Sequence, residues 1–540
     1  MKNLNFEISG GDLRGIDINV ITYNVMPSFI KSKEEIISNA FKYHSQGNIR
    51  KAEEFYQFFI DLGHTDPKVF CNYGVLLLNN GKPLDAQKYI EKAIDLKPNY
   101  ADAYLNLSNT YKFLSDYHQA EKSIRKVIEL KPNCAEAYIN LGVILEELRK
   151  PNEAIGSLYK SIELNPNLFL SYYTLGGLLI NHGELQEAYN CLIKSIDLNP
   201  DFTKSYYIIS TLDIPTNITS WQKYLFSSTI LKGKDSDEKI DIYSARSNIC
   251  HKQRKYSESA QYLKFSNDIK LSLVGSNCDS LIEKSKKLLS LSSKKDVCNK
   301  KVFNKQQEIF IVGMFRSGSS LIESILGMNT NVEVLGEVNL LEEAYLHMVN
   351  NNNNTDSMLY EIYLNNLTNT LLNKNIRTNK WLYNYQYAGI IASQMPNARI
   401  IHCFRNPLDN ILSIYRAHFT LGHEYSSSLI DCTEVYLDHE KIMTEYKNRF
   451  RSKIYDLNYD SLVSNPNKEI KSLINWLGWE WQESYLSPHL NPRSVQTRSN
   501  IEVRSPINSK SIGGWKNYKE MLQPAIKVLS KTERYRNLVS

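Results

Sequence analysis

One stretch, IFIVGMFRSGSSLIESIL at residues 309–326, decides the fold of the second half of this chain. A run of apolar and β-branched residues is followed by a glycine-bounded loop and then by apolar residues at helical spacing. A strand–loop–helix unit of this kind directs backbone N–H groups and a helix N-terminus at an anion. We therefore expect an anion-binding loop between Gly313 and Ser320.

This loop has the two glycines of the nucleotide-triphosphate P-loop, G-x-x-x-x-G-K-[ST], but it does not have the lysine. Gly313 and Gly318 have the required spacing, whereas Ser319 occupies the lysine position and the basic residue of the loop is Arg316. An ATPase needs that lysine on the β- and γ-phosphates and usually an acidic partner for magnesium. A P-loop kinase or NTPase is therefore disfavoured.

The segment GMFRSGSSLIESIL resembles the 5′-phosphosulfate loop of sulfotransferases, whose common form is G-x-P-R-S-G-T/S-T. It is similar in particular to the tyrosylprotein sulfotransferase branch and to bacterial repeat-containing relatives, although Phe315 replaces the usual proline. The resemblance implies that 3′-phosphoadenosine 5′-phosphosulfate is the sulfuryl donor. A sulfuryl group carries less charge than a phosphoryl group, so its transfer can use side-chain cations without a metal. The loop residues that would bind it are Arg316, Ser317, Gly318, Ser319 and Ser320.

A second segment, NARIIHCFRNPLDNILSIY at residues 397–415, has the pattern of a buried strand, then Arg405, then a helix that carries Ser413. Ligands of open parallel sheets bind at the carboxyl ends of the strands, which fits both segments. The family's 3′-phosphate site has an arginine and a serine at this spacing. The resemblance therefore assigns Arg405 and Ser413 to the 3′-phosphate of the nucleotide.

Two later segments resemble parts of the family that lie near the nucleotide. Tyr459 in NYDSLVSNP matches a strand-end Y-x-x-L, although ordinary packing is the alternative for this residue. SPINSKSIGGWKNYKEML at residues 505–522 resembles the S-x-G-x-W-x-x-Y segment that closes over the cofactor. Lys510, Ser511 and Trp515 are its candidate contacts, and a small satellite core is the alternative for Trp515.

The resemblance also implies catalytic residues. Glu337, after Gly336 in VEVLGEVNLL, matches the Gly-Glu that provides the catalytic base in tyrosylprotein sulfotransferases. An exposed acid at a helix start is the alternative. Lys380 in RTNKWLYNY resembles the lysine that precedes the 3′-phosphate strand. Together with Arg316, it would stabilise the bridging oxygen or the departing phosphate.

Two histidines are rival bases, because the cytosolic branch of the family uses histidine. His402 lies inside the apolar strand pattern IIHCF, which favours a core histidine. His418 lies beyond Ser413, where we expect a solvated position on the same helix. Glu337 is preferred over both, because its place at a strand end suits the cleft.

The first half of the chain has a period of 34 residues. The alanines at 86, 120, 154 and 188 and the prolines at 98, 132, 166 and 200 keep this step. Segments such as ADAYLNLSNTYKFLSDYHQAEKSIRKVIELKPN resemble the tetratricopeptide repeat, a helix pair that buries its apolar face only by stacking on its neighbours. The sequence therefore predicts an all-α tetratricopeptide superhelix followed by an α/β P-loop-like domain with a central parallel sheet.

We divide the chain into an N-terminal extension (1–32), the tetratricopeptide repeats (33–202), an irregular helical repeat and linker (203–300) and a sulfotransferase domain (301–540). The charge is too small to indicate a nucleic-acid partner, with 64 basic and 58 acidic residues. The eight cysteines include no C-x-x-C pair, and no apolar run has the length of a signal peptide or a membrane span. We expect a cytoplasmic protein.

The predicted function is transfer of a sulfuryl group from 3′-phosphoadenosine 5′-phosphosulfate to a hydroxyl acceptor, without a metal. The acceptor, a protein tyrosine, a saccharide, a lipid headgroup or a small metabolite, has no readable sequence signature. The repeats would bind a protein or peptide, or recruit the acceptor directly. The alternative is an inactive scaffold with a nucleotide-binding domain, but the full set of candidate residues argues against decay.

Overall fold

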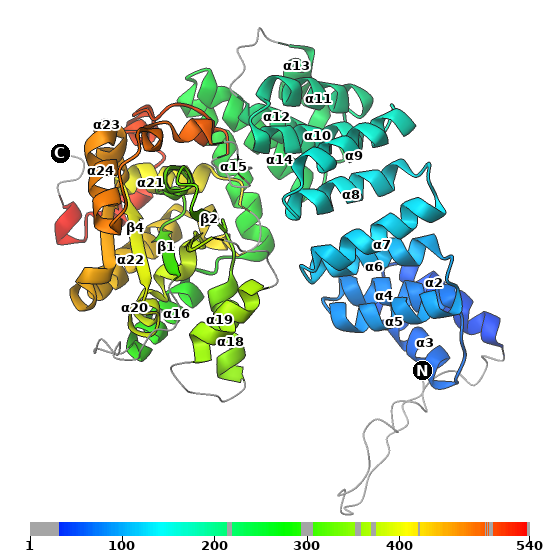
Figure 1. The fold of residues 1–540 in the computed structure, drawn as a ribbon. Coiled ribbons are helices and arrows are strands. Elements are labelled where there is room, and N and C mark those ends of the chain that lie inside the picture. Colours follow the sequence, from blue (N-terminus) through cyan, green and yellow to red (C-terminus); the bar gives the residue numbers. More distant parts are fainter. Residues whose placement is uncertain are drawn as a thin grey trace, which may run out of the picture. The chain divides into compact units, whose positions relative to one another are not determined.

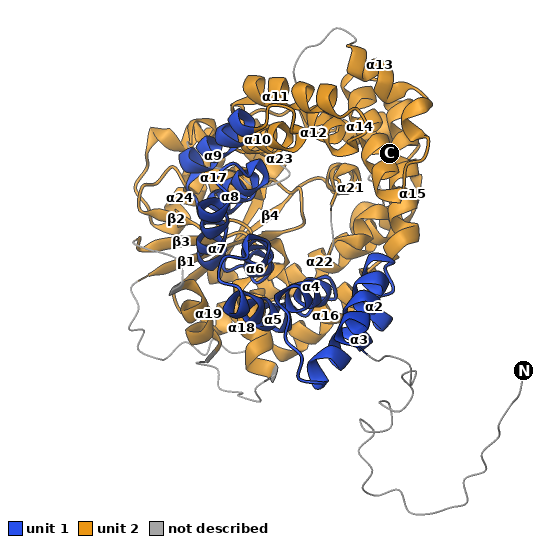
Figure 2. Cartoon of the chain, turned by 90° about the vertical axis from the view of Figure 1, so that its right-hand side faces the viewer, with its two compact units in different colours: residues 1–164 blue, residues 165–540 orange. Residues whose placement is uncertain are grey.

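The computed structural model describes residues 32–212, 219–292, 306–350, 358–368, 374–419, 422–491, 493, 495 and 500–536. Its contacts divide the chain into two compact units, residues 1–164 and 165–540 (Figure 2). The predicted domain boundaries at residues 32, 202 and 300 stay predictions. The predicted N-terminal extension lies outside the described residues except for Ser32, whose hydroxyl caps the first described helix.

The first unit consists of helix pairs (Figure 1). The pairs are α2 (Lys33–Ser45) with α3 (Ile49–Asp61), α4 (Pro67–Asn79) with α5 (Pro83–Leu96), α6 (Ala101–Phe113) with α7 (Tyr117–Leu130), and α8 (Ala135–Glu147) with α9 (Pro151–Leu164). The periodic alanines Ala86, Ala120 and Ala154 are fully buried. A Cβ on Gly74 of α4 would lie 2.4 Å from Ile90 Cγ1 of α5, so the two helices approach closely only because the residue is glycine.

The second unit begins with helices that continue this pattern. They are α10 (Phe169–His182), α11 (Leu185–Leu198), α12 (Thr203–Thr211), α13 (Ser220–Phe226), α14 (Ser236–Lys252), α15 (Tyr256–Val274) and α16 (Cys278–Leu291). Gly176 of α10 would place a Cβ 2.9 Å from Leu192 Cγ of α11, which is the same close approach. Helix α14 begins with a capping box, in which Asp235 and Glu238 satisfy each other's backbone N–H groups.

A five-stranded parallel sheet follows, with the strand order β2-β3-β1-β4-β5. The strands are β1 (Gln307–Gly313), β2 (Val332–Val334), β3 (Ile376–Asn379), β4 (Ala398–Phe404) and β5 (Ile454–Asn458). The helices around them are α17 (Ser319–Leu326), α18 (Leu340–Asn350), α19 (Met358–Thr368), α20 (Ala388–Gln394), α21 (Pro407–Arg416), α22 (Leu429–Arg449), α23 (Tyr459–Ser464), α24 (Pro466–Leu477) and α25 (Gln523–Leu529). The predicted fold class, helical repeats followed by a domain with a parallel sheet, is confirmed.

Both faces of the sheet are covered, which explains the continuous apolar run in β1. Ile309 and Ile311 pack in one cluster with residues of α17 and α24, whereas Phe310 and Val312 pack in another with residues of α20 and α22. Alternate side chains of a strand point to opposite faces, so a strand buried on both sides needs apolar residues throughout. No helix in the described part of the chain is long and apolar enough to cross a membrane.

Candidate functional site

The predicted site residues follow the carboxyl ends of the strands, which all lie at one edge because the sheet is parallel. Each strand contributes one position or segment. These are the 314–318 loop after β1, Glu337 after β2, Lys380 after β3, Arg405 after β4 and Tyr459 after β5. Segments spread over the whole domain therefore meet at one edge of the sheet.

The loop after β1 is tightly wound against its neighbours. A Cβ on Gly313 would lie 2.3 Å from the carbonyl oxygen of Cys403, and a Cβ on Gly318 would lie 2.2 Å from the Tyr459 ring. Gly318 has φ 95° and caps α17, which begins with Ser319 and Ser320. The Ser317 hydroxyl is buried and has no hydrogen-bond partner in the described part of the chain. The loop thus needs its glycines and offers a hydroxyl and a helix N-terminus to an anion.

Arg316 joins the two predicted anion sites. Its Nε donates to the Ser413 hydroxyl of α21 at 3.1 Å, so the phosphosulfate loop touches the predicted 3′-phosphate helix. The guanidinium also forms a 2.6 Å ion pair with Glu502, in a short 3₁₀ turn at Glu502–Arg504. Nothing in the sequence pattern around Glu502 indicated this contact.

Arg405, Tyr459 and Ser511 form a second group beside this loop. The Arg405 guanidinium lies 4.8 Å from the centre of the Tyr459 ring and donates to the Ser511 carbonyl at 2.8 Å. The Tyr459 hydroxyl is 3.1 Å from the Ser511 hydroxyl. Arg405 is 7% exposed, and its Nε has no partner within the described ranges. A buried guanidinium with an unused donor fits a phosphate.

The two other candidates in the C-terminal segment lie differently. Lys510 is exposed at the start of the turn. Trp515 is buried, belongs to the main hydrophobic cluster of the domain and donates its backbone N–H to Asp409. Its side chain therefore packs in the main core of the domain and not in the small satellite core that was the alternative, and its contact with the nucleotide stays a prediction.

Glu337 and Lys380 form an ion pair of 2.5 Å. The Lys380 side chain is fully buried, whereas the Glu337 side chain is 32% exposed. The backbone N–H of Lys380 also donates to the Gly336 carbonyl, which holds the ends of β2 and β3 together. The buried Lys380 ammonium thus orients the Glu337 carboxylate, which remains accessible to solvent.

The rival histidines are both engaged elsewhere. His402 is buried in β4, with Nδ1 2.8 Å from Asp456 and Nε2 3.2 Å from His439, and burial lowers its pKa. Helix α21 ends at Arg416, so His418 does not lie on the same helix as Ser413, contrary to our expectation. Nor is it simply solvated, because its Nε2 is 3.2 Å from Asp241 of α14.

Phe315, the departure from the usual loop pattern, anchors the loop in an aromatic cluster. Its ring contacts Tyr383, Phe419 and His423 with centroid distances of 5.1, 5.6 and 4.4 Å. Its backbone carbonyl also accepts a hydrogen bond from Asn410 of α21. In the usual loop, a proline restricts the backbone at this position. Here the aromatic packing and the hydrogen bond from Asn410 hold the backbone in place instead.

The segment that carries Glu502 is fastened to the end of α10. Arg504 donates to the backbone carbonyls of Asn181 and Asn491, at 2.8 and 2.6 Å. The Asn500 side chain donates to the Asn181 side chain at 3.0 Å. The segment between Asn500 and Arg504, which we call the clasp, thus links a repeat helix to Arg316.

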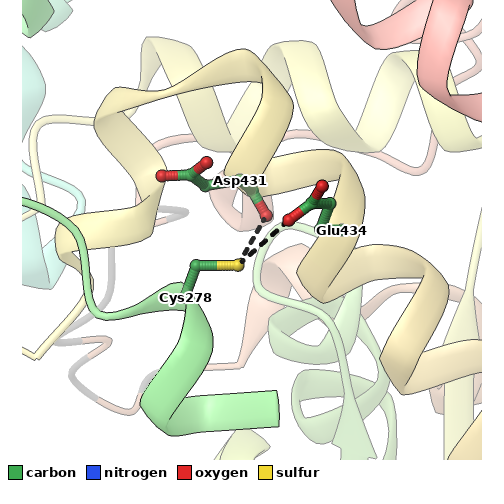
Figure 3. A group of neighbouring side chains, drawn as sticks. All are labelled: Cys278, Asp431 and Glu434. Atoms are coloured by element: carbon green, nitrogen blue, oxygen red, sulfur yellow. Dashed lines mark hydrogen bonds between the residues drawn. The ribbon is translucent and has the colours of Figure 1, made fainter.

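One group in the described part of the chain could offer three ligand atoms to a metal, namely Cys278, Asp431 and Glu434 (Figure 3). The Cys278 thiol lies 3.8 Å from the Glu434 carboxylate and 3.8 Å from the Asp431 backbone carbonyl. Burial and the neighbouring acids raise the pKa of Cys278 to about 12. A metal bound here would have to displace the proton of this thiol. The group lies on α16 and α22 and not at the strand ends.

Comparison with known families agrees with this architecture. Residues 308–483 match the sulfotransferase family, and residues 67–100, 101–134, 135–168 and 170–202 match the tetratricopeptide repeat. The chain therefore carries N-terminal tetratricopeptide repeats and a sulfotransferase family domain. The matched part of this domain runs from β1 past Tyr459 and stops before the clasp.

An uncharacterized protein of Aquifex aeolicus (strain VF5) is 28% identical over 247 residues, which are 42% of this chain and 32% of that relative. The crystal structure of MamA is 21% identical with a TM-score of 0.28, covering 30% of this chain and 94% of MamA. MamA 41-end from Desulfovibrio magneticus RS-1 is 19% identical with a TM-score of 0.30, covering 32% of this chain and 96% of that one. YrrB, a TPR protein with an unusual peptide-binding site, is 19% identical with a TM-score of 0.26, covering 38% and 96%.

Proposed function

We propose that the second half of the chain transfers a sulfuryl group from 3′-phosphoadenosine 5′-phosphosulfate to a hydroxyl acceptor. The observation that carries the proposal is the hydrogen bond between Arg316 and Ser413. This bond joins the 314–318 loop, which is suited to a phosphosulfate group, to helix α21, which carries a residue predicted to bind a second phosphate. A donor with phosphate groups on both its 3′ and 5′ sides fits two such adjacent sites.

The binding of this donor would use the residues at the ends of β1, β4 and β5. Arg316, Ser317 and the N-terminus of α17 would hold the 5′-phosphosulfate, and Arg405, Ser413 and Tyr459 the 3′-phosphate. The buried Ser317 hydroxyl and Arg405 Nε, both without partners among the described residues, support this assignment. Arg316 would exchange the Glu502 carboxylate for an oxygen of the donor.

In the transfer step, Glu337 would accept the proton of the acceptor hydroxyl. The acceptor oxygen forms a bond to sulfur as the bond from sulfur to the bridging phosphate oxygen breaks, and the leaving group keeps that electron pair. Lys380 orients Glu337 and, with Arg316, stabilises charge on the bridging oxygen. These roles need cations and a base but no metal.

The match of Gly336 and Glu337 to tyrosylprotein sulfotransferases makes a protein tyrosine the first acceptor to test, before saccharides, lipid headgroups and small hydroxyl compounds. The tetratricopeptide repeats support a protein or peptide partner for the first half of the chain. Seven free cysteines among the described residues fit a reducing, cytoplasmic compartment.

Two measurements test the proposal. Isothermal titration calorimetry should detect binding of adenosine 3′,5′-bisphosphate and no binding of ATP with magnesium. Incubation with sulfur-labelled donor and either tyrosine peptides or cell lysate should then produce a labelled acceptor. Binding of ATP with magnesium in place of the bisphosphate would overturn the assignment.

A further inference from the structure

Asp409 lies in the first turn of α21, four residues after Arg405, and it is 3% exposed. Its two carboxylate oxygens accept hydrogen bonds from separate backbone groups, the N–H of Gly513 at 2.7 Å and the N–H of Trp515 at 2.9 Å. A buried carboxylate is costly unless its oxygens are satisfied. These two bonds therefore tie the C-terminal segment firmly to α21.

Ser511, just before the two residues that Asp409 binds, contacts the proposed 3′-phosphate residues Arg405 and Tyr459. Ser511 accepts from Arg405 through its carbonyl and contacts the Tyr459 hydroxyl through its side chain. Only Ile512 separates Ser511 from Gly513, whose φ of 73° makes the turn between them. A displacement of Gly513 would thus carry Ser511 away from Arg405.

Asp409 and Ser413 are four residues apart on α21 and so lie on one face of the helix. Ser413 contacts Arg316 from this face, and Asp409 holds the segment that covers Arg405. The same helix face therefore sets the position of both the serine and the covering segment.

We propose that Asp409 is a positioning residue for the 3′-phosphate of the donor. It holds the Ser511–Trp515 segment against Arg405 and Tyr459 without touching the nucleotide. This inference rests on the proposed function. The role needs a carboxylate, because it uses two acceptors at once, whereas an asparagine has one acceptor and would turn its NH₂ group toward a backbone N–H.

The test compares two nucleotides on the full chain with Asp409→Asn. Adenosine 3′,5′-bisphosphate carries the 3′-phosphate, and adenosine 5′-monophosphate does not. Calorimetry should show about tenfold weaker binding of the bisphosphate, the effect of one charge-assisted hydrogen bond, and unchanged binding of the monophosphate. Trypsin should also cleave faster at Lys510 and Lys516, the exposed lysines at the ends of the segment.

Asp456→Asn is the matched control. Asp456 is a carboxylate of the same domain that accepts bonds from His402, Lys447 and Arg451 on β4, α22 and the turn before β5. Its loss should lower thermal stability but leave the ratio of the two nucleotide affinities unchanged. If Asp409→Asn does not fold, Asp409→Glu takes its place. This variant keeps the charge but lengthens the side chain, so it should also lower the ratio of bisphosphate to monophosphate affinity.

Two results would overturn the inference while the proposed function stands. In the first, Asp409→Asn keeps the wild-type ratio of bisphosphate to monophosphate affinity. In the second, both affinities fall together with the melting temperature, as in a general loss of structure. If the wild-type chain does not bind the bisphosphate at all, the proposed function fails and the inference falls with it.

Discussion

The helical repeats and the parallel-sheet domain bring their important residues together in opposite ways. In the repeats, close contacts join residues near in sequence, such as Gly74 and Ile90. In the sheet domain, Arg316 contacts Ser413 and Glu502, which are 97 and 186 residues away. The stability of a repeat array is approximately a sum of similar contributions from its repeats. A site built from distant segments, in contrast, requires every one of those segments to be in place. Substitutions in the repeats should therefore alter stability, and those at the strand ends should alter chemistry.

The largest effect is expected for Glu337→Gln. The amide keeps the size of the side chain but cannot serve as a base, so turnover should fall about 10²- to 10⁴-fold while nucleotide affinity stays unchanged. Labelled-sulfate transfer and calorimetry measure the two quantities. Glu333→Gln, a substitution in β2 four residues earlier, is the control and should remain active. Near-normal turnover of Glu337→Gln would remove Glu337 from the role of base.

The next effect concerns Arg405. Loss of its charge-assisted bonds in Arg405→Ala should weaken binding of adenosine 3′,5′-bisphosphate about 10- to 100-fold. Arg399→Ala is the control, because Arg399 lies near the opposite end of the same strand and its guanidinium packs over the Trp476 ring. Equal affinities of the two variants by calorimetry would contradict the 3′-phosphate assignment.

Two glycines test the repeat side of the comparison. A Cβ on Gly74 would meet Ile90 Cγ1 at 2.4 Å, so Gly74→Ala should lower the free energy of unfolding by about 1–3 kcal/mol. Gly156 of α9 has nothing within 4 Å of its Cβ position, so Gly156→Ala should raise that free energy by about 0.5–1 kcal/mol. Urea unfolding followed by circular dichroism measures both. Nucleotide affinity should stay at its wild-type value, and a change of affinity in either variant would break the proposed separation of roles.

The smallest effect is expected for Glu502→Gln. Arg316 would no longer give up an ion pair when the donor binds, so bisphosphate affinity should rise about two- to fivefold. The gain is small because the Glu502 side chain is 58% exposed, and it should shrink as salt is added. Glu520→Gln, another exposed acid of the C-terminal segment, controls for net charge. Weaker binding of Glu502→Gln would mean that Glu502 supports the site and does not compete for it.

Local patterns predicted much of this molecule from the sequence. The 34-residue period and the run from Ile309 to Leu326 each specify their structure within one short segment, and the strand-end positions of Arg405 and Glu337 follow from the strands predicted before them. The ion pair of Glu502 and the hydrogen bonds of Asp409 could not be predicted, because their partners are fixed only by the tertiary path of the chain. The aromatic cluster around Phe315 could not be predicted for the same reason, since Tyr383 and His423 come from other segments of the chain.

The clasp has a consequence for the repeats. Asn181, near the end of α10, holds Arg504, and two residues earlier Glu502 holds Arg316. If a partner bound at α10 favours an open clasp, it tightens binding of the donor, and the donor then tightens binding of that partner by the same factor. Helix α10 would in this way control donor binding through the single ion pair between Glu502 and Arg316.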